Sequence, residues 1–378
     1  MRWSLPIGRV RGIPLLLHVS FLLVLPLLAP IFGAQLSLAR GEPPAFLSMP
    51  TLTYGVAMVV GLFASVLAHE LAHALYALAH GGRVSSITLM LIGGVTRLER
   101  APERPWQEAM MALVGPLTSL ALGAGLLIAA ALTGGSVSPA VGLGLFSLGA
   151  MNLGLGIFNL LPAFPMDGGR ILRAALTPRL GALRATTVAA RTGQVFAVLF
   201  GIAGVLTGNL LLILVGFFVM LGAAGEAQQV RLRAVLEPMT VESLVSGPGV
   251  ALRTDDSLAL ALESFTLRHR EVLPVLDEKG RPVGVLRLAD LEEVPAAERD
   301  HEPVMAHLHP VDPIPPDTSV WSGLERLASE HLPLLPVASA EGPYLGYLSE
   351  AAIARALERT DPQDARSRHP GPKRRQPA

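Results

Sequence analysis

Apolar and polar positions are unevenly distributed along this chain. Residues 1–226 contain long apolar runs, whereas residues 227–378 mix charged, polar and apolar positions as soluble domains do. A helix needs about 20 apolar residues to span the hydrocarbon core of a bilayer. Candidate runs lie near residues 13–33, 54–80, 108–133, 140–161 and 193–224. The pattern predicts a polytopic α-helical membrane protein domain followed by a soluble module.

The fifth run is long for one crossing, and Thr207-Gly208-Asn209 interrupt it. We interpret it as a tight pair of helices, which gives about six transmembrane helices in all. Arginines precede the first run and follow the second and fourth, whereas the opposite loops carry only Arg40. Because basic loops stay on the cytoplasmic side, this pattern predicts a multi-pass protein of the cytoplasmic membrane. Its N-terminus and its soluble module would both lie in the cytosol.

Composition limits the chemistry that either part can perform. The 378 residues are 51% hydrophobic and 16% charged, with a formal net charge of +0. This balance gives no reason to expect a nucleic-acid partner. The chain contains no cysteine, so it forms no disulfide, and a metal site must use His, Asp or Glu.

The second apolar run contains HELAH at residues 69–73. Residues four apart share a helix face, so His69 and His73 can present two imidazoles to one ion, with Glu70 beside a bound water. Zinc suits this set because it lowers the pKa of bound water to about 7. Each ionisable group at membrane depth costs on the order of 2.5 kcal/mol or more unless it is paired. The clustering of such groups therefore favours a metal site over chance packing.

A third ligand is expected from another segment of the chain. His80 lies off the spacing of a third ligand on the same helix, so we interpret it as an interfacial residue. The fourth run crosses in the same direction as the second and ends in FNLLPAFPMDGGR, residues 158–170. Prolines break a helix at this depth only where the backbone lines a protein cavity. Asp167 is therefore the candidate third ligand; the alternative is a solvated aspartate in a helix-stop turn.

HELAH and NLLPAFPMDGG resemble the motifs of the site-2 proteases, the intramembrane zinc metalloproteases, whose patterns are H-E-x-x-H and N-x-x-P-x-P-x-x-D-G. Pro165 stands one place later than the second proline of that pattern. The similarity extends across about residues 5–225 and includes GIPLLLHVS at 12–20, LIGGVTRLE at 91–99 and ALVGP at 112–116. The resemblance implies one zinc ion held by His69, His73 and Asp167, Glu70 as general base, and a substrate-positioning role for Asn159.

Residues 84–99 alternate Val, Ile and Thr with small polar residues and are interrupted by Gly93-Gly94. This alternation predicts a short β-hairpin, similar to the membrane-associated hairpin of the site-2 proteases. A protease needs its substrate in extended form, and an exposed strand edge beside zinc can pair with such a segment. Gly93 and Gly94 are therefore candidate substrate-positioning residues. The alternative is a plain cytosolic connector.

An internal repeat lies within residues 237–358. LPVLDEKGRPVG at 273–284 aligns with LPVASAEGPYLG at 335–346, which lies 62 residues later. Two such copies pack into one α/β unit because neither buries its apolar face alone. The predicted limits are 1–226 for the membrane domain, 227–236 for a linker, 237–296 and 301–358 for the two copies, and 359–378 for a disordered basic tail.

The repeat resembles a tandem pair of CBS (cystathionine-β-synthase) domains. The resemblance implies an adenine nucleotide as a ligand, with Asp290 and Ser349 as candidate contacts, and regulation of the attached domain. A purely structural or substrate-docking module is the alternative. A homodimer formed through this module is a further prediction.

Together these features predict an intramembrane metalloprotease that acts in regulated intramembrane proteolysis. Zinc-activated water would hydrolyse a peptide bond of a membrane protein substrate within or near the lipid bilayer, with modulation through the CBS module. The alternative is a CBS-regulated metal or ion transporter, because intramembrane His, Asp and broken helices also mark permeation paths. Glu70 favours the protease, since a transporter needs no general base beside two metal ligands.

Overall fold

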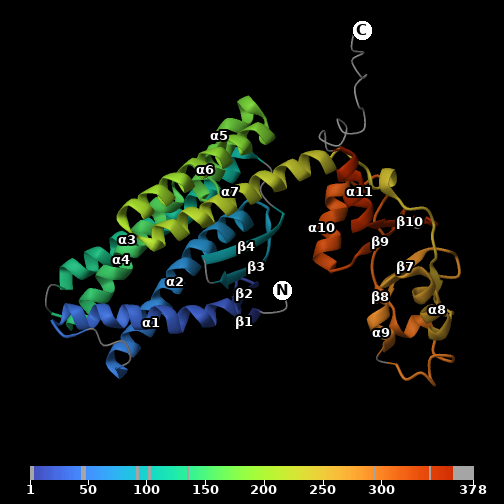
Figure 1. Ribbon diagram of the computed structural model, residues 1–378, viewed down its shortest axis with the longest axis horizontal. Coiled ribbons are helices and arrows are strands. Elements are labelled where there is room, and N and C mark those ends of the chain that lie inside the picture. The colour runs from blue at the N-terminus through green and yellow to red at the C-terminus, as the bar shows by residue number, and fades with distance from the viewer. Residues whose placement is uncertain are drawn as a thin grey trace, which may run out of the picture. The chain divides into compact units, whose positions relative to one another are not determined.

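The computed structural model divides into two compact units, Met1–Val230 and Arg231–Ala378 (Figure 1). It describes residues 4–43, 48–90, 93–100, 104–133, 136–292, 294–339 and 342–360. Of the predicted basic tail, residues 361–378 lie outside the described residues. Each unit is considered by itself.

The first unit combines apolar helices with one small sheet (Figure 1). The helices are α1 (Ser20–Ala39), α2 (Met49–Ala79), α3 (Pro105–Thr133), α4 (Pro139–Asn159), α5 (Asp167–Leu180), α6 (Ala182–Thr207) and α7 (Leu210–Leu236). Among the described residues, five helices are long and apolar enough to cross a membrane, namely α2, α3, α4, α6 and α7. A shorter apolar stretch, Leu25–Ala39, lies in α1. The predicted membrane fold with about six crossings is confirmed, and the count is approximate.

The fifth apolar run forms two helices, as predicted. α6 ends at Thr207, and Gly208 adopts a left-handed conformation with φ 65° that reverses the chain before α7. Residues 227–236, predicted as a linker, form the last part of α7.

The first apolar run differs from its prediction. Residues 13–33 were expected to form one helix, but Ile13–His18 is strand β2 and α1 begins at Ser20. Ile13 and Leu15 of this strand are buried in one apolar cluster with Ala74 of α2. A short apolar run fits a buried strand as well as a helix, so hydropathy alone could not distinguish them.

The predicted hairpin over residues 84–99 is confirmed and belongs to a larger sheet. β3 (Arg83–Met90) pairs antiparallel with β4 (Gly93–Arg100), and β2 pairs parallel with β3. β1 (Ser4–Val10) pairs antiparallel with β2, so the strand order is β1-β2-β3-β4. β4 is therefore an edge strand of this sheet.

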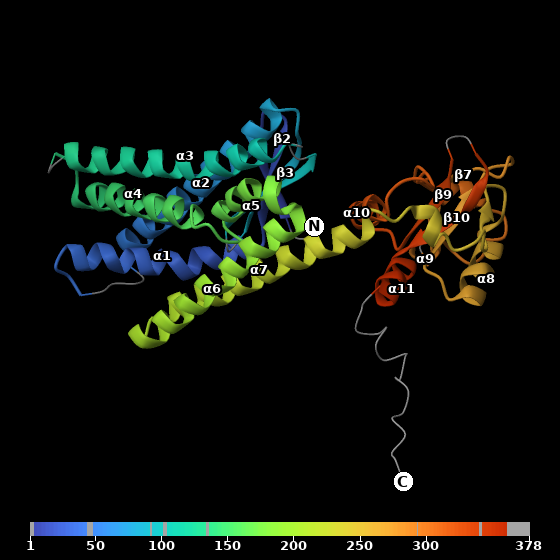
Figure 2. The same ribbon diagram turned by 90° about the horizontal axis from the view of Figure 1, so that it is seen from above.

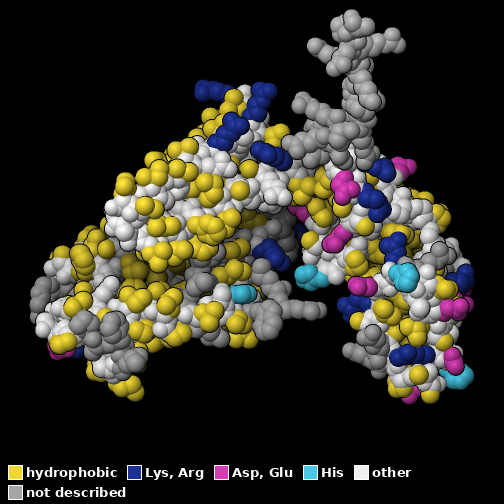
Figure 3. All heavy atoms as spheres, in the orientation of Figure 1, with side chains coloured by type: hydrophobic (Ala, Val, Ile, Leu, Met, Phe, Trp, Pro, Cys, Tyr) yellow, Lys and Arg dark blue, Asp and Glu magenta, His cyan; other side chains and the backbone are white. Residues whose placement is uncertain are grey.

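The helices of the first unit pack through small and polar residues. α3 and α4 run side by side (Figure 1, Figure 2). The buried Asn152 of α4 donates hydrogen bonds to the Ser65 hydroxyl of α2 at 2.9 Å and to the Leu148 carbonyl at 2.8 Å. Such interhelical hydrogen bonds stabilise helix association in lipid, where apolar contacts alone drive little. Hydrophobic side chains cover most of the visible helical surface (Figure 3), as a lipid-facing surface requires.

A short buried loop joins α4 to α5 and positions Asp167. α4 ends at Asn159, and α5 begins at Asp167. Within the loop Ala163 and Phe164 are fully buried, and the Phe164 N–H donates to the Ala189 carbonyl of α6 at 3.2 Å. This anchoring leaves Asp167 in the first turn of α5.

The second unit contains the predicted repeat. Its elements are η1 (Val241–Leu244), β5 (Leu252–Arg253), α8 (Leu258–Arg268), β6 (Val272–Leu276), β7 (Pro282–Arg287), α9 (Leu288–Glu292), η2 (Val304–His307), β8 (His309–Pro310), α10 (Val320–Glu330), β9 (Leu334–Ala338), β10 (Tyr344–Ser349) and α11 (Glu350–Thr360). α10, β9 and β10 each begin 62 residues after α8, β6 and β7. The helix ends repeat too: Ser257 and Ser319 cap the N-termini of α8 and α10, and His269 and His331 end them in left-handed conformations.

Candidate metal centre

His69, His73 and Asp167 converge at one point, although α2 carries the histidines and α5 begins with the aspartate. The Nε2 atoms of His69 and His73 are 3.1 Å apart. Oδ2 of Asp167 lies 3.2 Å from each of them. The side chains are only 6%, 13% and 15% exposed in that order. Three potential ligand atoms therefore face one another away from bulk water.

These distances fit a zinc ion. Zinc in a tetrahedral site with bonds of about 2.0–2.1 Å to N and O holds its ligand atoms about 3.3 Å apart. The three separations of 3.1–3.2 Å are close to that value. Two imidazoles and one carboxylate leave the fourth position of such a site open for water or substrate, as in catalytic zinc sites.

Helix α3 orients both imidazoles. Nδ1 of His73 lies 2.6 Å from the Met111 carbonyl oxygen, which can only accept, so Nδ1 carries the proton and Nε2 keeps its lone pair. Nδ1 of His69 lies 2.9 Å from the Ser119 hydroxyl, which can accept in the same way. Such partners fix the tautomer and ring orientation of metal-binding histidines.

Position 115 on α3 has room only for glycine. A Cβ on Gly115 would collide with Nε2 and Cε1 of His73 and would lie 2.9 Å from Nε2 of His69. Nothing in the spacing of ALVGP, residues 112–116, predicts this role. The available signal is a glycine inside a helix, which costs about 1 kcal/mol relative to alanine and so needs a packing reason.

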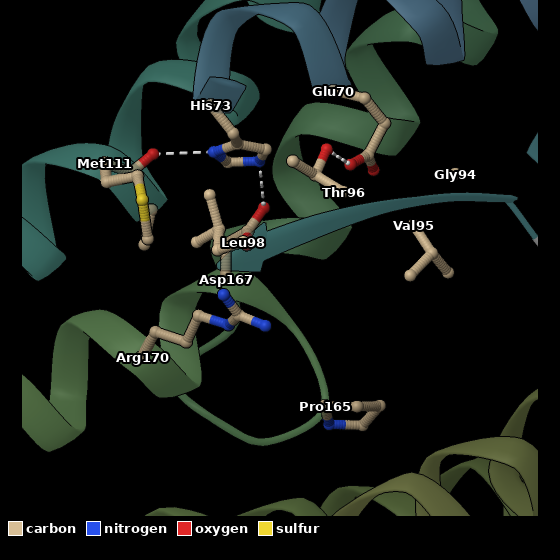
Figure 4. Close-up of a pocket in the computed structure, with 11 residues that line it drawn as sticks. Glu70, His73, Gly94, Val95, Thr96, Leu98, Met111, Pro165, Asp167 and Arg170 are labelled. Carbon is tan, nitrogen blue, oxygen red and sulfur yellow. Dashed lines mark hydrogen bonds and ion pairs between the residues drawn. The ribbon is translucent and has the colours of Figure 1, made fainter. Parts of the chain in front are cut away.

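Glu70 faces the same pocket from α2 and is held by the edge strand (Figure 4). The Thr96 hydroxyl of β4 donates to Oε2 of Glu70 at 2.6 Å. A Cβ on Gly94 would collide with Cγ of Glu70, so β4 approaches the carboxylate closely only because position 94 is glycine. The sequence predicts Glu70 and Gly94 as site residues but not the Thr96 hydrogen bond.

The pocket beside these residues has a volume of about 220 Å³. Its walls include Glu70, His73, Asp167 and Arg170, together with Val95 and Leu98 of β4. Burial disfavours the charge of Asp167, but hydrogen bonds with His69 and His73 and the nearby Arg170 charge outweigh it. The pKa of Asp167 is therefore well below its usual value, so its carboxylate stays ionised at neutral pH.

Two further predicted positions, Gly93 and Asn159, are not among the hydrogen-bond partners that the structure gives the three ligands and Glu70. Gly93 begins β4 with φ 130°, a conformation that favours glycine. The Asn159 amide at the end of α4 donates to the Leu155 carbonyl of its own helix at 3.0 Å. Their substrate-positioning roles stay predictions. His80, predicted as interfacial, is exposed just beyond α2 and stacks on Tyr76 with ring centroids 4.0 Å apart.

The two predicted nucleotide contacts lie in the second unit and already have protein partners. Asp290 lies 3.0 Å from Arg287 and 2.9 Å from Nε2 of His309. The buried Ser349 hydroxyl accepts from the Ala352 N–H at 3.2 Å, at the start of α11. Neither residue lines the pocket of about 300 Å³ that Arg270 and Tyr347 help to form. Their role in nucleotide binding stays a prediction.

Comparison with known proteins identifies the family. The model of Peptidase family M50 matches residues 57–145 and 134–200, and the CBS domain model matches residues 241–296. Zinc metalloprotease MJ0392 of Methanocaldococcus jannaschii is 31% identical over 94% of this chain and 97% of its own length. This chain belongs to peptidase family M50, the site-2 protease family. Rip3 of Mycobacterium tuberculosis is 33% identical over 97% of this chain and 98% of its own length.

The solved structure of a site-2 protease from Methanocaldococcus jannaschii is also similar to this chain. It is 36% identical, with a TM-score of 0.44, over 60% of this chain and 95% of that chain. Family membership makes this protein a multi-pass zinc metalloprotease, as the sequence predicts. These two relatives are named as zinc metalloproteases and match across the membrane and soluble parts alike, which favours the protease over the transporter alternative.

Proposed function

We propose that this protein hydrolyses a peptide bond of a membrane protein substrate within or near the bilayer. The observation that carries the proposal is the meeting of His69, His73 and Asp167 around a zinc-sized point at α2, a helix of membrane-spanning length. Glu70, one residue from a ligand, faces the same pocket. A hydrolytic site at this depth suits a substrate that is itself embedded in the membrane.

The chain's own groups divide the chemistry among them. Zinc, when held by His69, His73 and Asp167, lowers the pKa of water and polarises a carbonyl group. Glu70 takes a proton from the attacking water and returns it to the leaving amine. Thr96 holds one carboxylate oxygen of Glu70, so the other oxygen is free to reach the water. Met111 and Ser119 keep both imidazole Nε2 atoms directed at the metal.

Strand β4 provides a place for an extended substrate. It is the edge of its sheet, and Gly94, Val95, Thr96 and Leu98 all line the pocket. Among the described residues no strand pairs with its outer edge. We propose that the unwound substrate adds a strand there, where main-chain hydrogen bonds bring the scissile bond beside Glu70.

Thr96→Val tests the hydrogen bond to Glu70. We expect kcat to fall about 10- to 100-fold, because a hydrogen bond to a charged group contributes roughly 1.5–3 kcal/mol and valine has the same shape without the hydroxyl. Bound zinc and KM are expected to stay unchanged. Thr96→Ser keeps the hydroxyl and should restore most of the activity. Equal loss in both variants would show that β4 packing, rather than the hydrogen bond, matters.

The pathway, the membrane orientation and the regulation of the enzyme are also proposed here. We propose that it acts in regulated intramembrane proteolysis in the cytoplasmic membrane, with its N-terminus and CBS module in the cytosol. Basic side chains gathered over the α5 end of the first unit support this orientation (Figure 3). The CBS module would modulate cleavage by binding an adenine nucleotide, and it would also mediate a homodimer. The pocket lined by Arg270 and Tyr347 is the candidate site for this ligand, although Arg270 already donates to the Tyr347 hydroxyl at 2.7 Å and lies 5.3 Å from its ring centroid.

Metal removal tests the proposed function. We expect the purified protein to carry one zinc ion per chain and to cleave a single-pass membrane protein that co-purifies with its Glu70→Gln variant. Chelation should stop cleavage, and zinc, but not magnesium or calcium, should restore it, because imidazole ligands suit zinc and oxygen ligands suit the other two. Metal analysis measures the bound zinc, and mass spectrometry of the products measures cleavage.

The outcome that contradicts the proposal is cleavage by metal-free protein. Zinc-dependent flux into sealed liposomes, in the absence of any cleavage, would instead favour the transporter.

A further inference from the structure

Arg170 places a cation in the catalytic pocket without pairing it. Its half-buried side chain lines the pocket, and Figure 4 shows the guanidinium directed toward Asp167 and Leu98. Within the described part of the chain it makes no hydrogen bond or ion pair. Arg173, one turn further along α5, is paired with Glu108 of α3 and lies 5.4 Å from the Phe164 ring centroid. Of these two arginines, only Arg173 has an ion-pair partner among the described residues.

The position of Arg170 on its helix is electrostatically unfavourable for a cation. It lies in the first turn of α5, which begins at Asp167. The N-terminus of a helix carries a partial positive charge, which favours anions and disfavours a cation by roughly 0.3–1 kcal/mol. A partly desolvated guanidinium with no acceptor among the residues that the structure describes adds a further cost. An unfavourable placement that faces a catalytic pocket suggests that the charge serves the reaction.

The pocket's acidic groups do not use this charge as an ion pair. Glu70 accepts from Thr96, and the Oδ2 atom of Asp167 is directed at the two histidines. One oxygen of each carboxylate thus has another partner, and the Arg170 side chain lines the pocket that a substrate enters.

We propose that Arg170 is a catalytic residue that stabilises the oxygen of the scissile carbonyl group as that oxygen becomes negatively charged. When water adds to this carbonyl carbon, the C=O π electrons move onto the oxygen, which becomes negatively charged. A guanidinium already in place stabilises that charge with no reorganisation, and its fixed, planar donors suit an oxygen acceptor. The role rests on the proposed protease function and adds a second cationic group to the one that the metal supplies.

Arg170→Met tests this role, with Arg170→Lys as the conservative variant and Arg179→Met as the matched control. Arg179 lies in the last turn of the same helix and is exposed. We expect Arg170→Met to lower kcat about 10²–10³-fold, the usual effect of removing one such donor, with little change in KM. Lysine should recover part of this loss, and Arg179→Met should cleave like wild type.

A binding measurement separates this role from effects on folding or on the metal. N-phosphoryl-leucinamide carries an anionic tetrahedral group that imitates the charged carbonyl after water addition. We expect its affinity to fall about 100-fold in Arg170→Met and to persist in Arg179→Met, with zinc content equal in all variants. Calorimetry on the purified zinc-loaded proteins gives the affinities, and metal analysis gives the zinc content.

Three results would overturn the assignment. Equal affinity of wild type and Arg170→Met for this probe would show that the guanidinium does not meet the charged oxygen. Loss of zinc in Arg170→Met would place its role in keeping Asp167 ionised. An increase in KM alone would assign it to ground-state substrate binding. Failure of the proposed function looks different, because wild type itself would then lack cleavage.

Discussion

Replacement of Glu70 by glutamine is expected to slow cleavage severely while leaving zinc in place. The amide has the shape of the carboxylate and can still accept from Thr96, but it cannot take a proton from water. General-base catalysis contributes on the order of 10²–10⁴-fold, so kcat should fall by that factor. Single-turnover cleavage of the membrane substrate and metal analysis of the same preparation measure the two properties.

The control for this variant is Glu42→Gln, which makes the same chemical change at an exposed position after α1. It should behave as wild type. Full cleavage by Glu70→Gln with zinc bound would show that another group activates the water. Loss of zinc from Glu70→Gln would instead make Glu70 a metal ligand.

The proposed metal ligands could be predicted from the sequence, because helix periodicity and the cost of buried charge leave few candidate residues. Helix periodicity fixes the common face of His69 and His73, and the cost of burying ionisable groups argues against chance. Asp167 followed from the depth and direction of the fourth apolar run. It is also the only aspartate before Asp255, so few alternatives existed.

The residues that orient those ligands could not be predicted from the sequence, because their roles arise only from packing between segments. Met111 lies in an apolar helix and carries no sequence pattern that sets it apart from a lipid-facing position, and Gly115 carries only the general signal of a glycine inside a helix. Thr96 lies in a predicted strand, but which strand edge meets Glu70 depends on how the sheet rests on α2. The parallel pairing of β2 with β3 joins segments about 70 residues apart, beyond any local pattern.

The soluble unit shows the same division between local and long-range information. Its repeat was recognisable because glycine turns and apolar strands recur at the same spacing, and the helix caps Ser257 and Ser319 obey it as well. The His309 partner of Asp290 was not recognisable, because His309 belongs to β8, which pairs with β7 only after the chain has folded back.

Replacement of Asp167 by alanine is expected to remove zinc and all detectable cleavage. Loss of an outer hydrogen-bond partner already weakens metal binding about 10–100-fold. Loss of one of three protein ligands should therefore exceed that range. The change also leaves the Nε2 atoms of His69 and His73 facing each other at 3.1 Å without the carboxylate between them. Zinc affinity measured by competition with a chromogenic chelator tests the magnitude.

Asp255→Ala is the matched control, because Asp255 is 70% exposed and lies in the second unit. It should retain zinc and cleavage. Asp167→Glu provides a second comparison: it keeps the charge but moves the oxygens by one methylene, so weaker zinc binding and partial activity are expected. If Asp167→Ala kept wild-type zinc affinity, the third ligand would have to come from another group. Glu70, the other carboxylate in the pocket, would then be the first candidate, and its assignment as a free base would fall with that of Asp167.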